Sequence, residues 1–316
     1  MSRYHHVFEA IIAHARALPP VTVAVVYPLS DVALAGAIEA AELGLISPVL
    51  IGPRNDLLAL AKTCNLEIGP FAIVDVADDA AAATEGVRLC RAGKAEALMK
   101  GSLHTDHLMH AVMSDDAGLR TVRRISHTFV LDVPTYPRML LITDAAINIY
   151  PKLADKVDIV QNAIDLAKVL GVETPKVAVL SAVETVTPAI ASTIDAAALC
   201  KMADRGQIAG AVIDGPLAFD NAVNLKAAEI KHIHSPVAGQ ADILVVPDLE
   251  SGNMLAKQLE YLGDAEAAGI VLGARVPIIL TSRADSAKSR LASAAVAVLV
   301  AHARRKGEDG KPTIAH

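Results

Sequence analysis

Ser282 and Arg283 are adjacent residues whose chemistry suits the binding of an anion. They follow a strong strand pattern at residues 276–280 and precede a long predicted helix. A serine hydroxyl and a guanidinium at the start of a helix can both donate hydrogen bonds to a phosphate. The pattern equally allows Ser282 to be only a helix cap and Arg283 to be only a solvated charge.

Three further charged residues are predicted to stand at the ends of strands. Lys100, which is followed by Gly101, can pair with a phosphate or with a neighbouring carboxylate. Asp144 and Asp214 can act as acids in catalysis or as structural caps. Ligands of open α/β sheets bind beyond the carboxyl ends of the strands, so these positions are candidates for a functional site.

Residues 247–253 also follow a predicted strand and contain two more candidates. Gly252 would let the backbone approach a ligand closely. Asn253 could both donate and accept a hydrogen bond. The alternative interpretation is a turn followed by a capped helix that begins near residue 252.

Common nucleotide and hydrolase motifs are absent from the sequence. No G-x-G-x-x-G follows a predicted strand, and neither a P-loop nor a G-x-S-x-G motif occurs, which argues against a Rossmann dehydrogenase, a P-loop kinase and a serine hydrolase. Histidines recur at positions 104, 107 and 110 of a predicted helix and could bind a metal. Such histidines are more often half-exposed helix residues, so we expect no metal site.

The cysteines are few and far apart in the sequence. Cys64, Cys90 and Cys200 are odd in number, so the sequence predicts neither a disulfide framework nor a cysteine metal site. Each lies in a predicted helical run, where a structural thiol is expected rather than a catalytic one.

The composition predicts a globular protein with an aliphatic core. Hydrophobic residues make up 53% of the 316 residues, whereas aromatic residues make up 3%. The 29 Lys and Arg against 35 Asp and Glu give a net charge of −6, which argues against nucleic acid or an anionic membrane as a partner. The longest apolar stretch, residues 291–301, is shorter than the ~20 residues of a spanning helix. Residues 1–20 do not form a secretory signal, so we expect a cytoplasmic protein.

Short apolar runs typical of buried strands alternate with helix-length segments along most of the chain. This alternation predicts an α/β fold with mainly parallel sheets and helices on both faces. At residues 125–133 and 139–142 two strands follow each other without room for a helix, which predicts an antiparallel pair. The break in the pattern near residues 118–128 is the best candidate for a domain boundary.

Four segments at these positions resemble the phosphate acetyltransferase/phosphate butyryltransferase family, and the resemblance extends over nearly the whole chain. The longest segment, residues 237–253, matches the long and specific pattern A-G-x-A-(D/N)-(I/V)-L-V-x-P-D-L-x-x-G-N. The other three are residues 97–101, 142–148 and 280–286. In detail, the chain is similar to the phosphotransacetylase module that in some proteins follows an enoyl-CoA hydratase domain.

The resemblance implies two α/β domains with a cleft between them, as in the isocitrate and isopropylmalate dehydrogenases. Residues 1–125 plus 272–316 would form the first domain and residues 126–271 the second. The resemblance also implies a homodimer that transfers a short acyl group, acetyl or butyryl, reversibly between coenzyme A and inorganic phosphate. The partners would be acyl-CoA, CoA and phosphate, with no metal and no further cofactor.

The resemblance also assigns roles to candidate residues. Ser282 matches a serine that donates to the thioester sulfur or the oxyanion, and Arg283 matches an arginine that holds phosphate or the oxyanion. Acetyl-specific members have an aspartate as a base for the CoA thiol where this chain has Ser289, which leaves Asp285 as the nearby acid. A CoA-contacting arginine of those members has Met109 in its place here. We expect substrate binding from Lys100, Gly101, Asp144, Asp214, Gly252 and Asn253.

Two other functions stay open from the sequence. One is an NAD- and metal-dependent hydroxy-acid dehydrogenase of related fold, which would need clustered aspartate ligands that the sequence does not display. The other is a regulatory subunit that binds CoA or acyl phosphate without catalysis.

Overall fold

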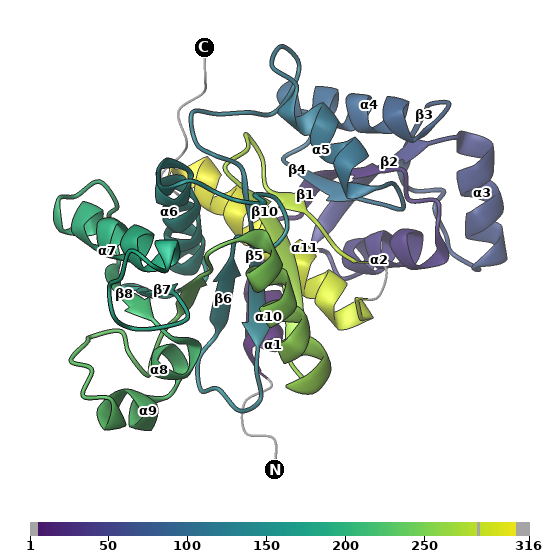
Figure 1. Ribbon diagram of the computed structural model, residues 1–316. Helices are drawn as coiled ribbons and strands as arrows, with labels where there is room; N and C mark the ends of the chain where they lie inside the picture. The colour runs from purple at the N-terminus through teal and green to yellow at the C-terminus, as the bar shows by residue number, and fades with distance from the viewer. Residues whose placement is uncertain (1–5, 283–284, 308–316) are drawn as a thin grey trace. The chain divides into compact units, whose positions relative to one another are not determined.

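The computed structural model describes residues 6–282 and 285–307, and the chain divides into two compact units (Figure 1). We name each unit after a candidate residue that it contains. The Lys100 unit comprises Phe8–Arg123 and Ala268–His316, and the Asp144 unit comprises Met1–Val7 and Arg124–Ala267. Both units are built from strands and helices in alternation, which confirms the predicted α/β class. The division into two α/β domains, with residues 1–125 plus 272–316 in the first and residues 126–271 in the second, stays a prediction.

The Lys100 unit contains a mainly parallel sheet with the strand order β3-β2-β1-β4-β11-β10. Strand β1 pairs in parallel with β2 and β4, and β4 pairs in parallel with β11, whereas β10 runs antiparallel to β11. The carboxyl ends of β1, β4 and β11 therefore lie at one edge, and the turn from β10 to β11 lies at the opposite edge. The strands are β1 (Val21–Val26), β2 (Ile46–Gly52), β3 (Ala72–Asp75), β4 (Ala97–Lys100), β10 (Glu266–Leu272) and β11 (Ile278–Ile279).

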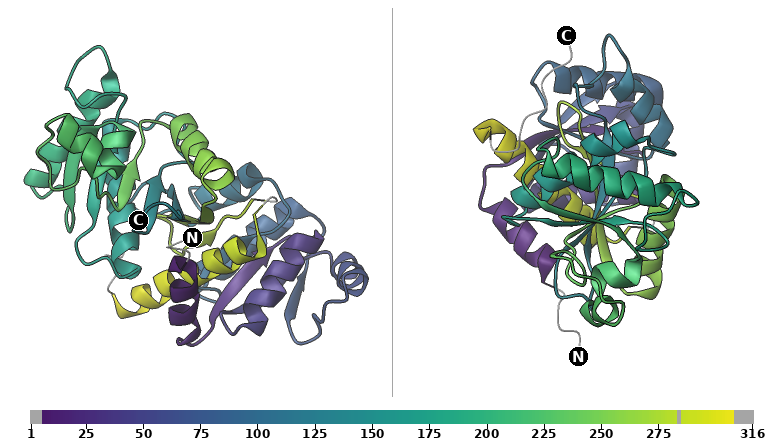
Figure 2. Two further views of the ribbon diagram at one scale, coloured as in Figure 1. Left: turned by 90° about the horizontal axis from the view of Figure 1, so that it is seen from below. Right: turned by 60° about the vertical axis from the view of Figure 1, so that its left-hand side comes forward.

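Helices cover this sheet, and the last of them lies deepest. Residues 291–303 of α11 are all buried, which explains why this stretch consists mostly of Ala, Val and Leu. Helix α11 packs against α2, β4 and β11, whereas α4 packs against α5 and β1 (Figure 2). The helices are α1 (Val7–Arg16), α2 (Asp31–Glu42), α3 (Arg54–Thr63), α4 (Asp79–Arg91), α5 (Thr105–Met113) and α11 (Ala287–Lys306).

The Asp144 unit contains strands in the order β5-β6-β9-β7-β8. Strands β5 and β6 pair antiparallel, which confirms the prediction for residues 125–133 and 139–142. The other pairs are parallel. The strands are β5 (Ser126–Asp132), β6 (Leu140–Thr143), β7 (Lys176–Leu180), β8 (Val212–Leu217) and β9 (Ile243–Val245). The helices are α6 (Leu153–Val169), α7 (Ala191–Asp204), α8 (Phe219–Val223), α9 (Leu225–Ile230) and α10 (Leu249–Leu262).

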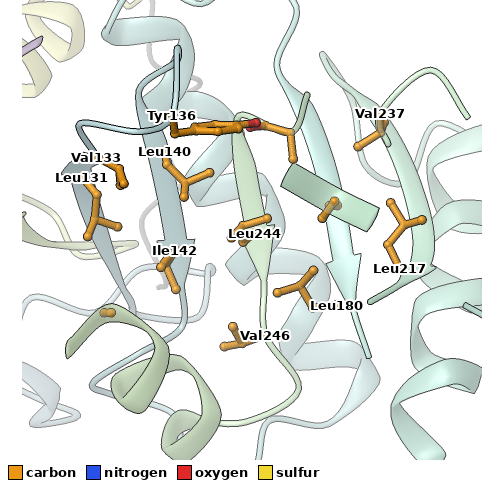
Figure 3. Packing of buried hydrophobic residues seen from close by; sticks show 14 of the residues in the cluster. Leu131, Val133, Tyr136, Leu140, Ile142, Leu180, Leu217, Val237, Leu244 and Val246 are labelled. Atoms are coloured by element: carbon orange, nitrogen blue, oxygen red, sulfur yellow. The ribbon is translucent and has the colours of Figure 1, made fainter. Parts of the chain in front are cut away.

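Aliphatic side chains from neighbouring strands fill the core of the Asp144 unit (Figure 3). Ile142 of β6 and Leu244 of β9 belong to one buried cluster with Leu180 of β7. The ring of Tyr136 is buried in this cluster, and its hydroxyl donates to the carbonyl oxygen of Ala241 at 2.7 Å. The core thus fixes the strand ends to which the candidate residues of this unit are attached.

Two predicted positions differ in the structure. Asp214 lies inside β8 rather than after it, because the strand continues to Leu217. Helix α10 begins at Leu249, so Gly252 lies within the helix and not before it. No helix in the described part of the chain combines the length and the apolar character needed to cross a membrane.

Candidate functional site

A cavity of about 150 Å³ lies at the carboxyl edge of the sheet in the Lys100 unit. It brings together three predicted residues, Lys100, Gly101 and Ser282, which come from the ends of β4 and β11. The first turn of α2 lines the same cavity. The polar lining is what a small anion needs, because cationic side chains and the amino end of a helix both favour negative charge.

The segment that follows β4 is attached to the end of β1. The amides of Gly101 and Ser102 donate to the carbonyl oxygens of Val26 and Tyr27 at 2.8 and 2.9 Å, and the Ser102 hydroxyl donates to the same Tyr27 oxygen. A Cβ atom on Gly101 would lie 2.3 Å from the Val26 oxygen, so only glycine fits here. This close approach places Lys100 at the wall of the cavity.

Two hydrogen bonds join Ser282 to Asp285 between β11 and α11. The Ser282 amide donates to Oδ2 of Asp285 at 2.7 Å, and the Asp285 amide donates to the Ser282 carbonyl oxygen at 3.2 Å. The cap of α11 is Ser286, so the interpretation of Ser282 as a helix cap is wrong. Helix α11 begins at Ala287, whereas the sequence pattern placed its start near Ser282. Arg283 itself lies outside the described residues.

The structure adds Arg290 to the cavity lining, a residue that the sequence analysis missed. Its Nη1 donates to the Asp285 carbonyl oxygen at 2.6 Å, and its Cδ would lie 2.9 Å from a Cβ atom on Gly36 of α2. Gly36 therefore makes room for the arginine side chain. The sequence could have indicated Arg290 through its spacing from Ser286. Arg290 lies four residues, about one helical turn, after this cap and therefore on the same face of α11.

In the Asp144 unit, the Asp144 carboxylate is bonded within its own loop. It accepts hydrogen bonds from the amides of Ala146 and Ile147 at 2.9 and 3.0 Å and from the Asn148 side chain at 2.5 Å. Asp144 is only 3% exposed, and this burial raises its pKa, although the hydrogen bonds oppose the shift. The contacts of Asp144 are those of a structural anchor for residues 144–148.

Helix α10 packs its first turns on this loop. A Cβ atom on Gly252 would lie 2.8 Å from the Asp144 carbonyl oxygen, which explains the glycine. The Asn253 side chain donates to the Ala145 carbonyl oxygen at 3.2 Å. Asp248 caps the helix by accepting from the Ser251 amide. The structure thus brings together three of the predicted substrate-binding residues, Asp144, Gly252 and Asn253.

Asp214 does not join this group. Strand β8 stands at the end of the strand order, separated from β6 by β9 and β7. Three strand spacings of ~4.8 Å put Asp214 roughly 14 Å from the end of β6. Its Oδ1 accepts from the neighbouring Gly215 amide. Substrate binding by Asp214, Asp144, Gly252 and Asn253 stays a prediction.

The histidines at the cap of α5 and within it make local contacts. Nδ1 of His107 lies 2.8 Å from Oδ2 of Asp79 on α4, and this hydrogen bond raises the pKa of His107 and lowers that of Asp79. The rings of His104 and His107 meet edge to face at 5.7 Å. In the ranges that the structure describes, no three His, Cys, Asp or Glu residues form a group that could hold a metal ion.

Fold and cavity together define a class of protein: an α/β protein with a polar cavity at the carboxyl ends of parallel strands, where open α/β sheets bind their ligands. Comparison with known proteins makes this class specific. Residues 80–298 match the family model described as "Phosphate acetyl/butaryl transferase". The chain belongs to this family, which confirms the resemblance that the sequence motifs indicated.

Individual relatives match over nearly the full chain. A phosphate acetyltransferase of Rhizobium meliloti is 60% identical over 301 residues, which cover 95% of each chain. A phosphate butyryltransferase of Clostridium beijerinckii is 40% identical over 95% of this chain and 99% of its own. Among solved structures, a branched-chain phosphotransacylase from Enterococcus faecalis V583 has a TM-score of 0.79 and 31% identity, covering 89% of this chain and 99% of its own.

A more distant structure shares the fold alone. A 4-hydroxythreonine-4-phosphate dehydrogenase from Klebsiella pneumoniae has a TM-score of 0.55 and 14% identity and covers 90% of this chain. The predicted likeness to dehydrogenase folds is consistent with this match.

Proposed function

We propose that this protein reversibly transfers a short acyl group between coenzyme A and inorganic phosphate, and that phosphate binds in the cavity beside Lys100 and Ser282. The family membership and the 60% identity to a phosphate acetyltransferase support the reaction. The observation that supports the location is the meeting of Lys100, Ser282 and Arg290 around one cavity at the ends of parallel strands.

The reaction makes one bond and breaks another. A phosphate oxygen attacks the thioester carbonyl carbon of acyl-CoA, and the carbonyl oxygen becomes an oxyanion in the tetrahedral intermediate. When this intermediate collapses, the C–S bond breaks, so that acyl phosphate forms and CoA leaves as a thiolate. Two bound substrates held in contact can react in this way without a covalent enzyme intermediate, a metal or a further cofactor.

The family resemblance and the cavity lining suggest a role for each residue. The Ser282 hydroxyl donates to the sulfur or to the oxyanion. Arg283, which matches the family's arginine, holds the phosphate or the oxyanion in bidentate geometry. Lys100 and Arg290 add positive charge, which lowers the repulsion between phosphate and the anionic CoA. The protein is acidic overall, so this local excess of cations has to come from specific residues.

A further step is proton transfer at the CoA sulfur, which leaves as a thiolate in the forward reaction and must lose its proton in the reverse reaction. Asp285 remains the candidate base for the reverse reaction, and its Oδ2 already accepts the Ser282 amide. We therefore propose that Asp285 mainly holds Ser282 in place through this hydrogen bond. A change of Asp285 to Asn would then alter turnover only modestly.

The remaining predictions belong to the same proposal. We propose that the protein acts in the cytoplasm as a homodimer, with acyl-CoA, CoA and phosphate as small-molecule partners. The acyl group is acetyl or butyryl, because relatives of both names match over 95% of the chain.

The test is an assay of thiol release from acyl-CoA in the presence and absence of phosphate. Acetyl-CoA, propionyl-CoA and butyryl-CoA are compared, with and without a chelator. We expect phosphate-dependent release that the chelator does not affect. Binding of acyl-CoA without phosphate-dependent release would identify a regulatory subunit, and loss of turnover that only a divalent metal restores would refute this mechanism.

A further inference from the structure

A second pocket of the Lys100 unit, with a volume of about 360 Å³, has four arginines in its lining. They come from three parts of the chain: the end of α4, the turn between β10 and β11, and the last turn of α11. No role in acyl transfer has been assigned to any of them. The arginines are Arg91, Arg275, Arg304 and Arg305.

The cavity lined by Lys100, Ser282 and Arg290 is called the Ser282 cavity below. The second pocket lies at the opposite edge of the sheet. Ala95 and Glu96, which line it, precede β4, whereas Lys100 ends the same strand. Helix α11 supplies Arg290 to the Ser282 cavity and Arg305 to the second pocket, 15 residues later, which corresponds to about 22 Å along a helix. The two pockets are therefore separate sites on one unit.

Positive charge exceeds negative charge in the lining. Among the described residues, Glu96 is the one carboxylate there, and it is bound by both Nε and Nη2 of Arg305 at 2.5 and 2.6 Å. Nη1 of Arg91 donates to an uncharged group, the Gly118 carbonyl oxygen, at 3.3 Å. Glu96 is thus already bound by one arginine, and Arg91 and Arg275 contribute further positive charge.

Arg275 supplies a second, independent observation. Its Nε is buried and has no hydrogen-bond partner among the residues that the structure describes. A buried donor without a partner costs free energy, and an anion that entered the pocket would provide an acceptor for this guanidinium. The Arg275 amide donates to the Leu119 carbonyl oxygen, so the backbone at this position is fixed independently of the side chain.

We propose that this arginine pocket binds a small phosphate-bearing anion. A guanidinium fork matches two phosphate oxygens at once, which distinguishes arginine from lysine as a phosphate ligand. The volume falls within the ~300–1,000 Å³ of typical small-molecule sites, so one or two phosphate groups with a small attached body fit. Arg91 and Arg275 are the residues that contact the anion.

The test is calorimetric titration of the full chain with inorganic pyrophosphate at low ionic strength. Arg91→Met and Arg275→Met should each raise the Kd at least about tenfold, because each removes a charge-assisted contact. Arg88→Met is the matched control, since Arg88 lies one turn before Arg91 on α4, is paired with Glu85 and does not line the pocket. This control should change the Kd less than about twofold, as expected for a screened distant charge.

A second control separates this pocket from the Ser282 cavity. Lys100→Met removes a cation from that cavity and should leave pyrophosphate binding to the arginine pocket in place. The proposal is overturned if pyrophosphate does not bind the wild-type chain, if Arg91→Met and Arg275→Met bind it with unchanged Kd, or if Arg88→Met weakens binding equally. Melting curves of every variant show that a lost affinity does not come from a lost fold.

Discussion

The two candidate regions carry similar polar residues at strand ends but use them differently. In the Lys100 unit, Lys100, Ser282 and Arg290 line an open cavity of about 150 Å³. In the Asp144 unit, the Asp144 carboxylate is buried and accepts hydrogen bonds from the residues that directly follow it. A polar group that lines a cavity can meet a substrate, whereas one that is surrounded by donors of its own loop stabilises that loop.

This difference separates two kinds of effect that substitutions should have. Changes around the Ser282 cavity should alter turnover or substrate affinity and leave stability nearly unchanged. Changes around Asp144 should alter stability first.

The largest effect is expected from Arg283. Replacing it by Ala or Lys should lower kcat by about 10²–10³, because one preorganised donor to the developing oxyanion is lost and lysine does not reproduce bidentate geometry. Steady-state kinetics in both directions, with melting curves as the control for folding, measure this effect. Turnover near that of the wild type in Arg283→Ala would remove the Ser-Arg pair from the mechanism.

A large effect of the other kind is expected from Asp144. Asp144→Ala leaves the part-buried amides of Ala146 and Ile147 and the buried Asn148 without an acceptor, and it should lower the free energy of unfolding by about 2–3 kcal/mol. In urea unfolding, the matched variant Asp248→Ala should cost only about 1 kcal/mol, because it removes a single helix cap. A stable Asp144→Ala protein with a strongly raised KM for acyl-CoA would show instead that Asp144 binds substrate.

Arg290 should act on affinity rather than on rate. Arg290→Met should raise the KM for phosphate about tenfold and change kcat less than about threefold, because one cation leaves the cavity while Ser282 and Arg283 remain. Lys288→Met is the control, since Lys288 lies on the same helix, pairs with Glu9 and does not line the cavity. Equal effects of the two variants would mean that only overall charge matters.

His127 should make the stability of the protein depend on pH. Burial lowers the pKa of this histidine on β5 from 6.5 to about 3. Below pH 6.5 the unfolded chain therefore binds a proton that the folded chain does not, and the free energy of unfolding should fall by up to about 1.4 kcal/mol per pH unit until the folded pKa is reached. Urea unfolding between pH 7 and pH 4, compared with His127→Leu, measures this contribution; identical slopes for the two proteins would contradict it.

The smallest effects are expected from the cysteines. Burial raises the pKa of Cys90 and of Cys200 to about 12, so neither thiol supplies a thiolate nucleophile near neutral pH. Cys64→Ala, Cys90→Ala and Cys200→Ala should each retain most of the turnover. Trapping of an acyl-cysteine on the reaction path would contradict direct attack by phosphate.

The sequence predicted the alternation of strands and helices because apolar runs and caps are local signals. The antiparallel pair β5 and β6 was predictable from the short connection alone. The start of α10 was misplaced because Asp248 is a cap whose side chain acts on the Ser251 amide, and aspartate is equally common in turns. The extent of β8 was missed because Gly215 and Pro216 ordinarily end a strand.

The candidate site was predictable where it depends on strand ends and not where it depends on packing. Lys100, Gly101 and Ser282 follow strands and were found. Arg290 is one of several charged residues on a helix, and its role depends on the space that Gly36 leaves on another helix. The structural contacts of Asp144 depend on how its own loop folds back on the carboxylate, which no spacing in the sequence shows.

The comparison of Ser282→Ala with Asn253→Ala tests the contrast between the two regions most directly, because each variant removes one polar group. Turnover and melting temperature are measured for both proteins under the same conditions. The account predicts that Ser282→Ala loses about 10² in kcat with an unchanged melting temperature, whereas Asn253→Ala loses the hydrogen bond to Ala145 and melts earlier with little change in kcat. The opposite result, a large loss of kcat in Asn253→Ala and near wild-type turnover in Ser282→Ala, would contradict it.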